Sequence, residues 1–132
     1  EVILDLAGGN VFIIFSLLLW GSVLLSAFID NIPYVATMLP VVTIIATNIA
    51  GSTGLDPAAQ TQLVTLLYFA LLSGATLGGN MTPIGASANI TAIGILRKEG
   101  YEVKTGEFMR IGVPFTLAAV TTAYLLIWFI WS

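Results

Sequence analysis

Residues 76–90 read TLGGNMTPIGASANI, and this stretch decides how the chain folds. Apolar sequence flanks it on both sides, as in a helix that crosses a membrane. Its Gly and Pro residues break helices, and its Asn, Thr and Ser side chains offer oxygen atoms. A polar break at membrane depth is tolerated only where it is buried in protein or lines a water-filled cavity. The stretch therefore predicts a discontinuous transmembrane helix over 61–97, with its break at 78–89.

The composition is that of a membrane protein. Of the 132 residues, 58% are hydrophobic and 8% are charged, whereas a soluble domain averages about 25% charged residues. The chain contains no Cys and no His, which excludes disulfides, thiolate metal sites and His-based catalysis within it. We see no nucleophile–base pair in the sequence, so we expect no enzyme activity and no cofactor. No basic patch is present, which argues against nucleic acid as a partner.

The first part of the chain predicts a helical hairpin over 11–49. Residues 1–10 look like the tail of a preceding element, and 11–29 are long and apolar enough to cross a bilayer. The segment 30–33, Asp-Asn-Ile-Pro, then interrupts the apolar run with turn and helix-start residues. The hairpin is either a plain pair of transmembrane helices or a re-entrant hairpin with its tip at 30–33. An external loop follows over 50–60.

Charge sets the expected orientation. All four basic residues fall within 97–110: Arg97, Lys98, Lys104 and Arg110. The positive-inside rule places this segment in the cytoplasm, with a loop over 98–107. The last transmembrane helix, 108–131, then leads outward, so the C-terminus is expected outside a plasma or inner membrane. Upstream, Asp56-Pro57 is a good helix start.

Asp30 is the strongest candidate for a site residue. It is the only acidic residue bounded by long apolar runs, and ionisable groups inside a membrane are costly and usually functional. Its carboxylate would serve an Na⁺ or H⁺ site. The alternative interpretation is an N-cap for the second arm of the hairpin, worth about 1 kcal/mol. The two roles are compatible.

The break and the hairpin tip supply further candidates for substrate or ion binding. They are Asn31, Gly79, Asn80, Thr82, Pro83, Gly85, Ser87 and Asn89. Hard cations such as Na⁺ prefer oxygen ligands, which favours a sodium site at Asp30, Asn31, Asn80 and Asn89. The alternative for each polar side chain is a hydrogen bond that repairs the broken backbone. Nearby, the spacing of Gly74 and Gly78 is typical of close helix packing.

Two stretches carry a resemblance to a known family. SAFIDNIPYVATMLPVV (26–42) and GATLGGNMTPIGASANITAIGI (74–95), in this order and spacing, resemble the arsenite/sodium–proton antiporter permeases of the ion transporter superfamily. The nearest branch is that of the pink-eyed-dilution protein, and the divalent-anion/sodium symporters are more distant. The resemblance covers about 11–130 and corresponds to the C-terminal part of such a permease.

The resemblance implies an all-α integral membrane fold that forms one half of an inverted repeat. This half has a re-entrant helical hairpin, a discontinuous transmembrane helix and a final transmembrane helix. With Leu39-Pro40 as the anchor, residues 30–32 fall where the symporters carry Ser-Asn-Thr at the hairpin tip. Residues 85–89 fall where they carry Gly-Thr-Pro-Pro-Asn, and keep the Gly and the Asn. The Asp at the tip favours a cation or a proton-coupled step over carboxylate binding.

The expected function is therefore secondary active transport. An elevator-type permease would move an inorganic ion or small anion, coupled to Na⁺ or H⁺, in contact with the lipid bilayer. The chain would pair with a missing N-terminal repeat or with a second chain, and the complete permease would be a homodimer. The alternative is a small membrane assembly or interaction subunit, in which the two breaks serve packing only.

Overall fold

The computed structural model describes residues 10–132, and over this range the chain is helical. The helices are α2 (Val11–Ser26), α3 (Asn31–Thr53), α4 (Pro57–Gly78), α5 (Ser87–Lys98) and α6 (Thr105–Trp131). This confirms the expected helical membrane protein. The expected tail at 1–10 lies outside the described residues except for Asn10, whose side chain accepts a hydrogen bond from the Phe12 N–H at 3.0 Å.

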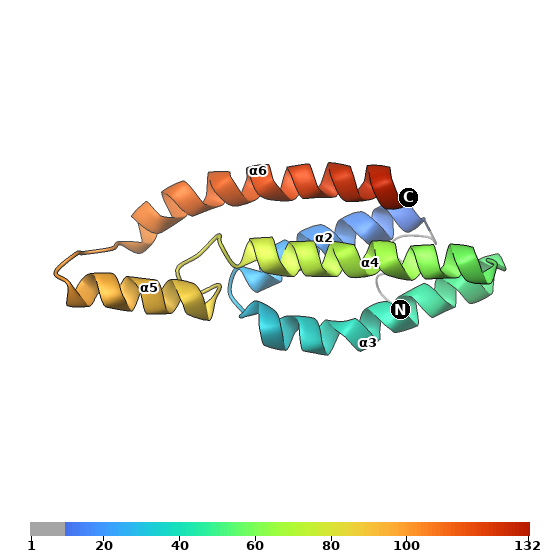
Figure 1. The fold of residues 1–132 in the computed structure, drawn as a ribbon, viewed down its shortest axis with the longest axis horizontal. Coiled ribbons are helices and arrows are strands. Elements are labelled where there is room, and N and C mark those ends of the chain that lie inside the picture. The colour runs from blue at the N-terminus through green and yellow to red at the C-terminus, as the bar shows by residue number, and fades with distance from the viewer. Residues whose placement is uncertain (1–9) are drawn as a thin grey trace.

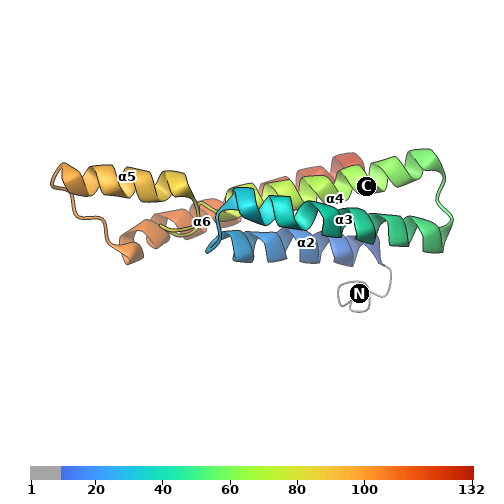
Figure 2. The same ribbon diagram turned by 90° about the horizontal axis from the view of Figure 1, so that it is seen from below.

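Helix α4 is the centre of the fold. It packs most extensively against α2, then against α3 and α6. Figures 1 and 2 show α2, α3 and α6 running alongside it, with α5 continuing beyond its end. Helix α5 has almost no contact with the other described helices. The molecule is therefore a four-helix assembly with one helix that projects from it.

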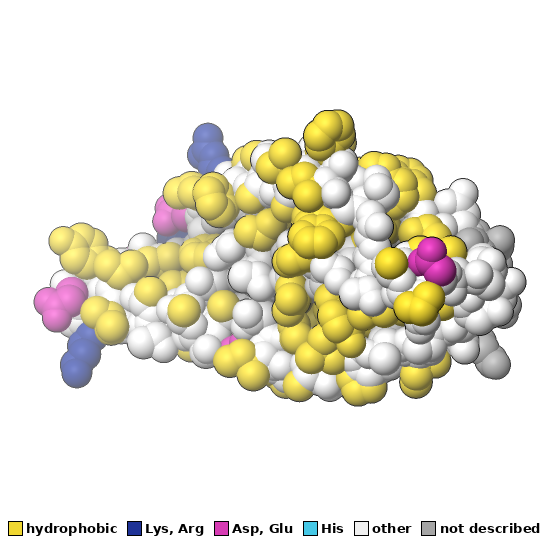
Figure 3. All heavy atoms as spheres, turned by 45° about the vertical axis from the view of Figure 1, so that its right-hand side comes forward, with side chains coloured by type: hydrophobic (Ala, Val, Ile, Leu, Met, Phe, Trp, Pro, Cys, Tyr) yellow, Lys and Arg dark blue, Asp and Glu magenta, His cyan; other side chains and the backbone are white. Residues whose placement is uncertain are grey.

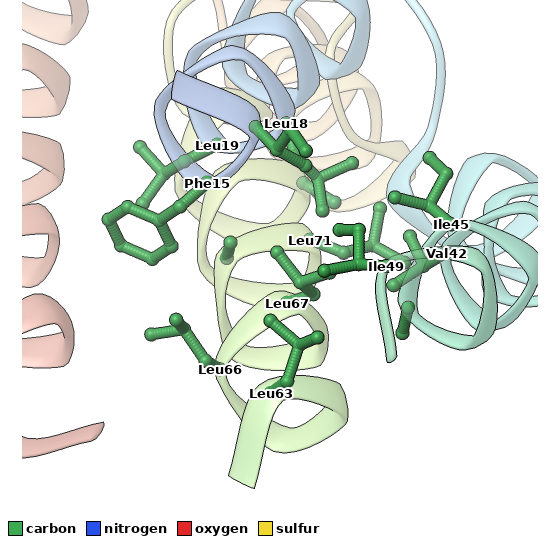
Figure 4. Packing of buried hydrophobic residues seen from close by; sticks show 14 of the residues in the cluster. Phe15, Leu18, Leu19, Val42, Ile45, Ile49, Leu63, Leu66, Leu67 and Leu71 are labelled. Atoms are coloured by element: carbon green, nitrogen blue, oxygen red, sulfur yellow. The ribbon is translucent and has the colours of Figure 1, made fainter. Parts of the chain in front are cut away.

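The core lies where α2, α3 and α4 meet. Phe15 and Leu19 of α2, Val42 of α3, and Leu67 and Leu71 of α4 are all fully buried. Figure 4 shows Val42, Leu67 and Leu71 between α3 and α4, and Phe15 on the side of α2 that faces α6. Helix α6 joins through aromatic contacts, because the Phe15 ring lies 5.4 Å from both the Tyr124 and the Trp128 rings.

Two glycines let α4 approach α2 closely. A Cβ built on Gly78 would lie 2.5 Å from the Val23 carbonyl oxygen, and one on Gly74 would lie 2.8 Å from Ser22 Cβ. Neither distance leaves room for a larger side chain. The helix-packing interpretation of the Gly74 and Gly78 spacing is confirmed.

Three helices, α3, α4 and α6, are long and apolar enough to cross a membrane, and α2 is a shorter apolar helix. Helix α4 starts at Pro57, as Asp56-Pro57 indicates and four residues before the expected 61, and Asp56 Oδ1 accepts a hydrogen bond from the Ala59 N–H at 2.7 Å. The large apolar side chains left exposed come from every described helix. Figure 3 shows how much of one face is hydrophobic, with basic side chains projecting only near the end where α5 lies.

Several boundaries differ from those expected from sequence. Helix α2 ends at Ser26 instead of 29, and α3 continues to Thr53 instead of 49. The hydroxyls of Ser52 and Thr53 both donate to the Ile49 carbonyl, at 3.0 and 2.6 Å, which completes the last turn of α3. Gly54 then ends this helix with a left-handed φ of 64°. The connection to α4 is correspondingly shorter than the expected loop over 50–60.

The helix break and the last helix also differ at their ends. The non-helical segment runs over 79–86, against 78–89 expected, because Gly78 stays in α4 and α5 already starts at Ser87. The last helix begins at Thr105, three residues before the expected 108. Pro114 lies inside this helix, as Pro40 does inside α3.

Candidate functional site

The hairpin tip and the helix break lie against each other. The buried Thr82 hydroxyl donates a hydrogen bond to the Ala27 carbonyl oxygen. A Cβ built on Gly85 would lie 2.9 Å from the same oxygen. Figure 1 shows the α2–α3 connection beside the end of α4. We call residues 26–31 together with 78–86 the tip–break junction.

Asp30 joins two helix N-termini within this junction. Its Oδ1 accepts a hydrogen bond from the Ile32 N–H of α3 at 3.4 Å, and its Oδ2 accepts one from the Ser87 N–H of α5 at 3.1 Å. The N-cap residue of α5 is Ala86, which provides no side-chain hydrogen bond. The carboxylate of Asp30 therefore supplies this cap, and its negative charge complements the positive end of the α5 dipole.

Asn89 bridges the two sides of the helix break. Its amide nitrogen donates to the Gly79 carbonyl at 2.8 Å and to the Thr82 carbonyl at 3.1 Å. The Gly79 carbonyl is freed where α4 ends, and the amide satisfies it, whereas the Thr82 carbonyl also accepts from the Gly85 N–H at 3.3 Å. The geometry matches the backbone-repair interpretation of Asn89. The side-chain carbonyl oxygen of Asn89 is the part that remains suited to a cation.

Glycine makes the break compact. A Cβ on Gly79 would lie 2.9 Å from the Gly85 carbonyl oxygen, and a Cβ on Gly85 would lie 2.6 Å from the Gly79 carbonyl oxygen. The two ends of the segment 79–86 thus touch through their backbones. Side chains at either position would push the ends apart.

The structure places the remaining predicted site residues around this centre. Asn31 is the first residue of α3, and Ser87 is the first residue of α5. Asn80 and Pro83 lie in the break and are half-buried, whereas Ser87 is exposed. The structure therefore brings together the two predicted polar breaks, with Asp30 and Ser87 in direct contact.

Two residues of this region were not expected from sequence. A Cβ on Gly112 of α6 would lie 2.6 Å from the Asn80 carbonyl oxygen, so α6 packs directly on the break. The buried Ser26 hydroxyl donates to the Ala75 carbonyl and fastens α2 to α4. Ser22 and Ser26 are spaced to lie on one face of a helix within an apolar run, and this pattern could have indicated the contact that Ser26 makes with α4. A lone Gly112 offered no such pattern.

The site presents oxygen atoms and a single carboxylate. Within residues 10–132, no group of three His, Cys, Asp or Glu side chains lies close enough to hold a metal ion. A cation at the junction would thus combine Asp30 with backbone carbonyl and amide oxygens, which are ligands of the kind that hard cations accept.

Comparisons with known proteins bear on this arrangement. The chain is 39% identical over 124 residues to a protein named as an uncharacterized transporter in Mycobacterium tuberculosis. The aligned region covers 94% of this chain and 27% of that protein. The relatives support a transporter family for the chain. A protein in Mycobacterium bovis that is likewise named as an uncharacterized transporter has the same identity and coverage.

The P protein is a second kind of relative. The mouse P protein is 44% identical over 113 residues, covering 84% of this chain and 12% of the P protein. It represents the pink-eyed-dilution branch that the sequence resembles. The chain thus spans about a quarter or less of the length of these curated relatives. No family model matches the chain, and no solved structure matches it.

Proposed function

We propose that the chain is the C-terminal part of a secondary active transporter that moves an inorganic ion or small anion, coupled to Na⁺ or H⁺. The observation that carries the proposal is the Asp30 carboxylate at the junction of two helix breaks. An acidic side chain between apolar helices is costly unless it has a role, and oxygen-rich breaks suit an ion. The relatives named as transporters support the same role.

The proposed movement is of the elevator type. The close approaches at Gly78, Gly85 and Gly112 connect α2, α4, the break and α6. A unit packed this tightly would move as one body past the rest of the transporter. We propose a re-entrant α2–α3 hairpin within this unit, a second repeat elsewhere in the protein and a homodimer as the complete assembly. The segment 97–110 would face the cytoplasm, and the C-terminus the outside.

Ion binding would be coupled to the position of α5. In the structure, Asp30 Oδ2 accepts the Ser87 N–H, which caps α5. A cation or proton at this oxygen weakens that hydrogen bond, because it offsets the negative charge that makes the carboxylate a strong acceptor. Occupation of the site would thus weaken the link between the hairpin tip and α5. This coupling is how a local binding event would change the helix arrangement.

The test compares two aspartates that both cap helices. The full-length protein and its Asp30→Asn and Asp56→Asn variants are reconstituted into liposomes, and ion flux is measured under Na⁺ and pH gradients. Asn keeps one acceptor oxygen, so each variant can still cap the helix that follows it, α3 or α4, whereas Asp30→Asn also loses the second acceptor, which receives the Ser87 N–H. We expect Asp30→Asn to lower coupled flux by about tenfold or more, as loss of an ion ligand or its supporting group does. Asp56→Asn should transport like the wild type.

Two outcomes would count against the proposal. Flux in Asp30→Asn with the wild-type dependence on Na⁺ and pH would remove Asp30 from the transport site. Flux no greater than that of protein-free liposomes for the wild type, over a panel of inorganic ions, would favour the assembly or interaction subunit.

A further inference from the structure

A cavity of about 290 Å³ lies between α5 and the start of α6. Its walls are mainly apolar and come from the break, from α5 and from the loop after α5, with Ile84, Ile90, Ile93 and Val103 among them. It lies on the opposite side of the break from the α2–α3–α4 core. The cavity is thus separate from Asp30, which does not line it.

The apolar surface of this region continues outside the cavity. Ile84 and Ile90 line the cavity and are still 57% and 55% exposed. Within residues 10–132, α5 buries only Ile93 among its side chains. In a membrane protein such a surface faces lipid or other protein.

One charge distinguishes the cavity from an ordinary lipid-facing groove. Arg97, in the last turn of α5, is the only charged residue among those that line it in the described part of the chain. The acidic residues of the adjoining loop, Glu99 and Glu102, do not line it. Figure 3 shows basic and acidic side chains projecting at this end of the molecule. The one charge among the residues that line the cavity is therefore positive, whereas its walls are mainly apolar.

We propose that the cavity binds one anionic phospholipid of the cytoplasmic leaflet. An acyl chain would lie against Ile84, Ile90 and Ile93, and the phosphate would meet the Arg97 guanidinium. Basic pockets between membrane helices on the cytoplasmic side are suited to anionic headgroups, and the planar guanidinium matches phosphate oxygens. Free phosphate would satisfy Arg97 but leave the apolar walls uncovered. The site does not depend on the transport role proposed above, but its assignment to the cytoplasmic leaflet rests on the orientation proposed there for 97–110.

The experiment measures lipid retention on the full-length protein by native mass spectrometry. The protein is loaded with phosphatidylglycerol or with phosphatidylcholine of identical acyl chains. We expect preferential retention of phosphatidylglycerol, and Arg97→Gln should reduce it by about tenfold, as expected for a lost charge-assisted hydrogen bond. Lys98→Gln is the matched control, because Lys98 is the adjacent basic residue and does not line the cavity. It should keep wild-type retention.

A second variant tests the apolar part of the site. Gly94 lines the cavity, and a Cβ built on it meets no atom within 4 Å. Gly94→Leu should fill the space and reduce retention of both lipids while the protein elutes as the wild type does. Equal retention of the two lipids by the wild type, or unchanged phosphatidylglycerol retention in Arg97→Gln, would overturn the proposal. Displacement of the bound lipid by millimolar inorganic phosphate alone would also overturn it, in favour of a simple anion site.

Discussion

The tip–break junction and helix α5 are neighbours in the chain, but they are held in opposite ways. At the junction, backbone meets backbone at Gly78, Gly79 and Gly85, and Thr82 is buried. Helix α5 buries one side chain, Ile93, and is tied to the junction by the hydrogen bonds of Asp30 and Asn89. The tip–break junction is therefore fixed by close packing, and α5 by a few polar contacts.

This difference separates a rigid part from an adjustable part. Close-packed backbones resist any change of spacing, because a shift of even a methyl group causes overlap. A helix held by single hydrogen bonds responds to whatever competes for them. Substitutions should thus be severe at the junction and mild on α5, and this contrast can be measured.

The largest contrast is expected between two Gly→Ala substitutions. Gly78→Ala would place a Cβ 2.5 Å from the Val23 carbonyl, whereas Gly94→Ala would meet nothing within 4 Å. We expect Gly78→Ala to destabilise the full-length protein by about 3 kcal/mol. Gly94→Ala should be neutral or stabilising by up to about 1 kcal/mol, because Ala favours the helix. Unfolding in mixed micelles by titration with SDS measures both, and equal effects would contradict the packing difference.

A smaller contrast is expected between the buried hydroxyl of Thr82 and the exposed hydroxyl of Thr91. Thr82→Val removes the hydrogen bond to the Ala27 carbonyl at the junction and leaves that oxygen without its donor. Thr91→Val removes a bond of 2.9 Å to Ser87 within exposed α5. Unfolding free energies should fall by about 1–2 kcal/mol for Thr82→Val and hardly change for Thr91→Val. The reverse order would show that the junction is not held by Thr82.

The smallest effect is expected at Ser26. Its hydroxyl bonds to the Ala75 carbonyl between α2 and α4, and hydrogen bonds between membrane helices are worth about 0.6 kcal/mol on average. Ser26→Ala should cost about that amount in the same unfolding assay. Ser52→Ala is the control, because Ser52 donates to Ile49 within its own helix. A loss in Ser52→Ala as large as in Ser26→Ala would argue against an interhelical role for Ser26.

Much of the fold follows from local sequence signals. The apolar runs predict the helices, and the glycines of 78–85 predict where α4 ends. Asp56-Pro57 predicts the start of α4, because an acceptor side chain and a fixed φ favour a helix N-terminus at that point. The Gly74 and Gly78 spacing predicts close packing, although it does not identify α2 as the partner.

The rest depends on three-dimensional placement. Asp30 and Ser87 are 57 residues apart, so no local pattern shows that the Asp30 carboxylate caps α5. Gly112 becomes important only because α6 crosses the break at that point. Helix α3 continues to Thr53 with two hydroxyls bonded back to Ile49, and these side-chain hydrogen bonds are not part of helix propensity. Sequence therefore locates the candidate site, and the fold determines which of its atoms meet.

The central claim is that Asp30 links the hairpin tip to α5, and amide hydrogen exchange of the full-length protein tests it most directly. Asp30→Ala and Asp56→Ala each remove the carboxylate that caps a helix. Losing about 1 kcal/mol of capping should raise exchange about fivefold at residues 87–90 in Asp30→Ala. Asp56→Ala should raise it only at the start of α4. Unchanged exchange at 87–90 in Asp30→Ala would contradict the link between the hairpin tip and the broken helix.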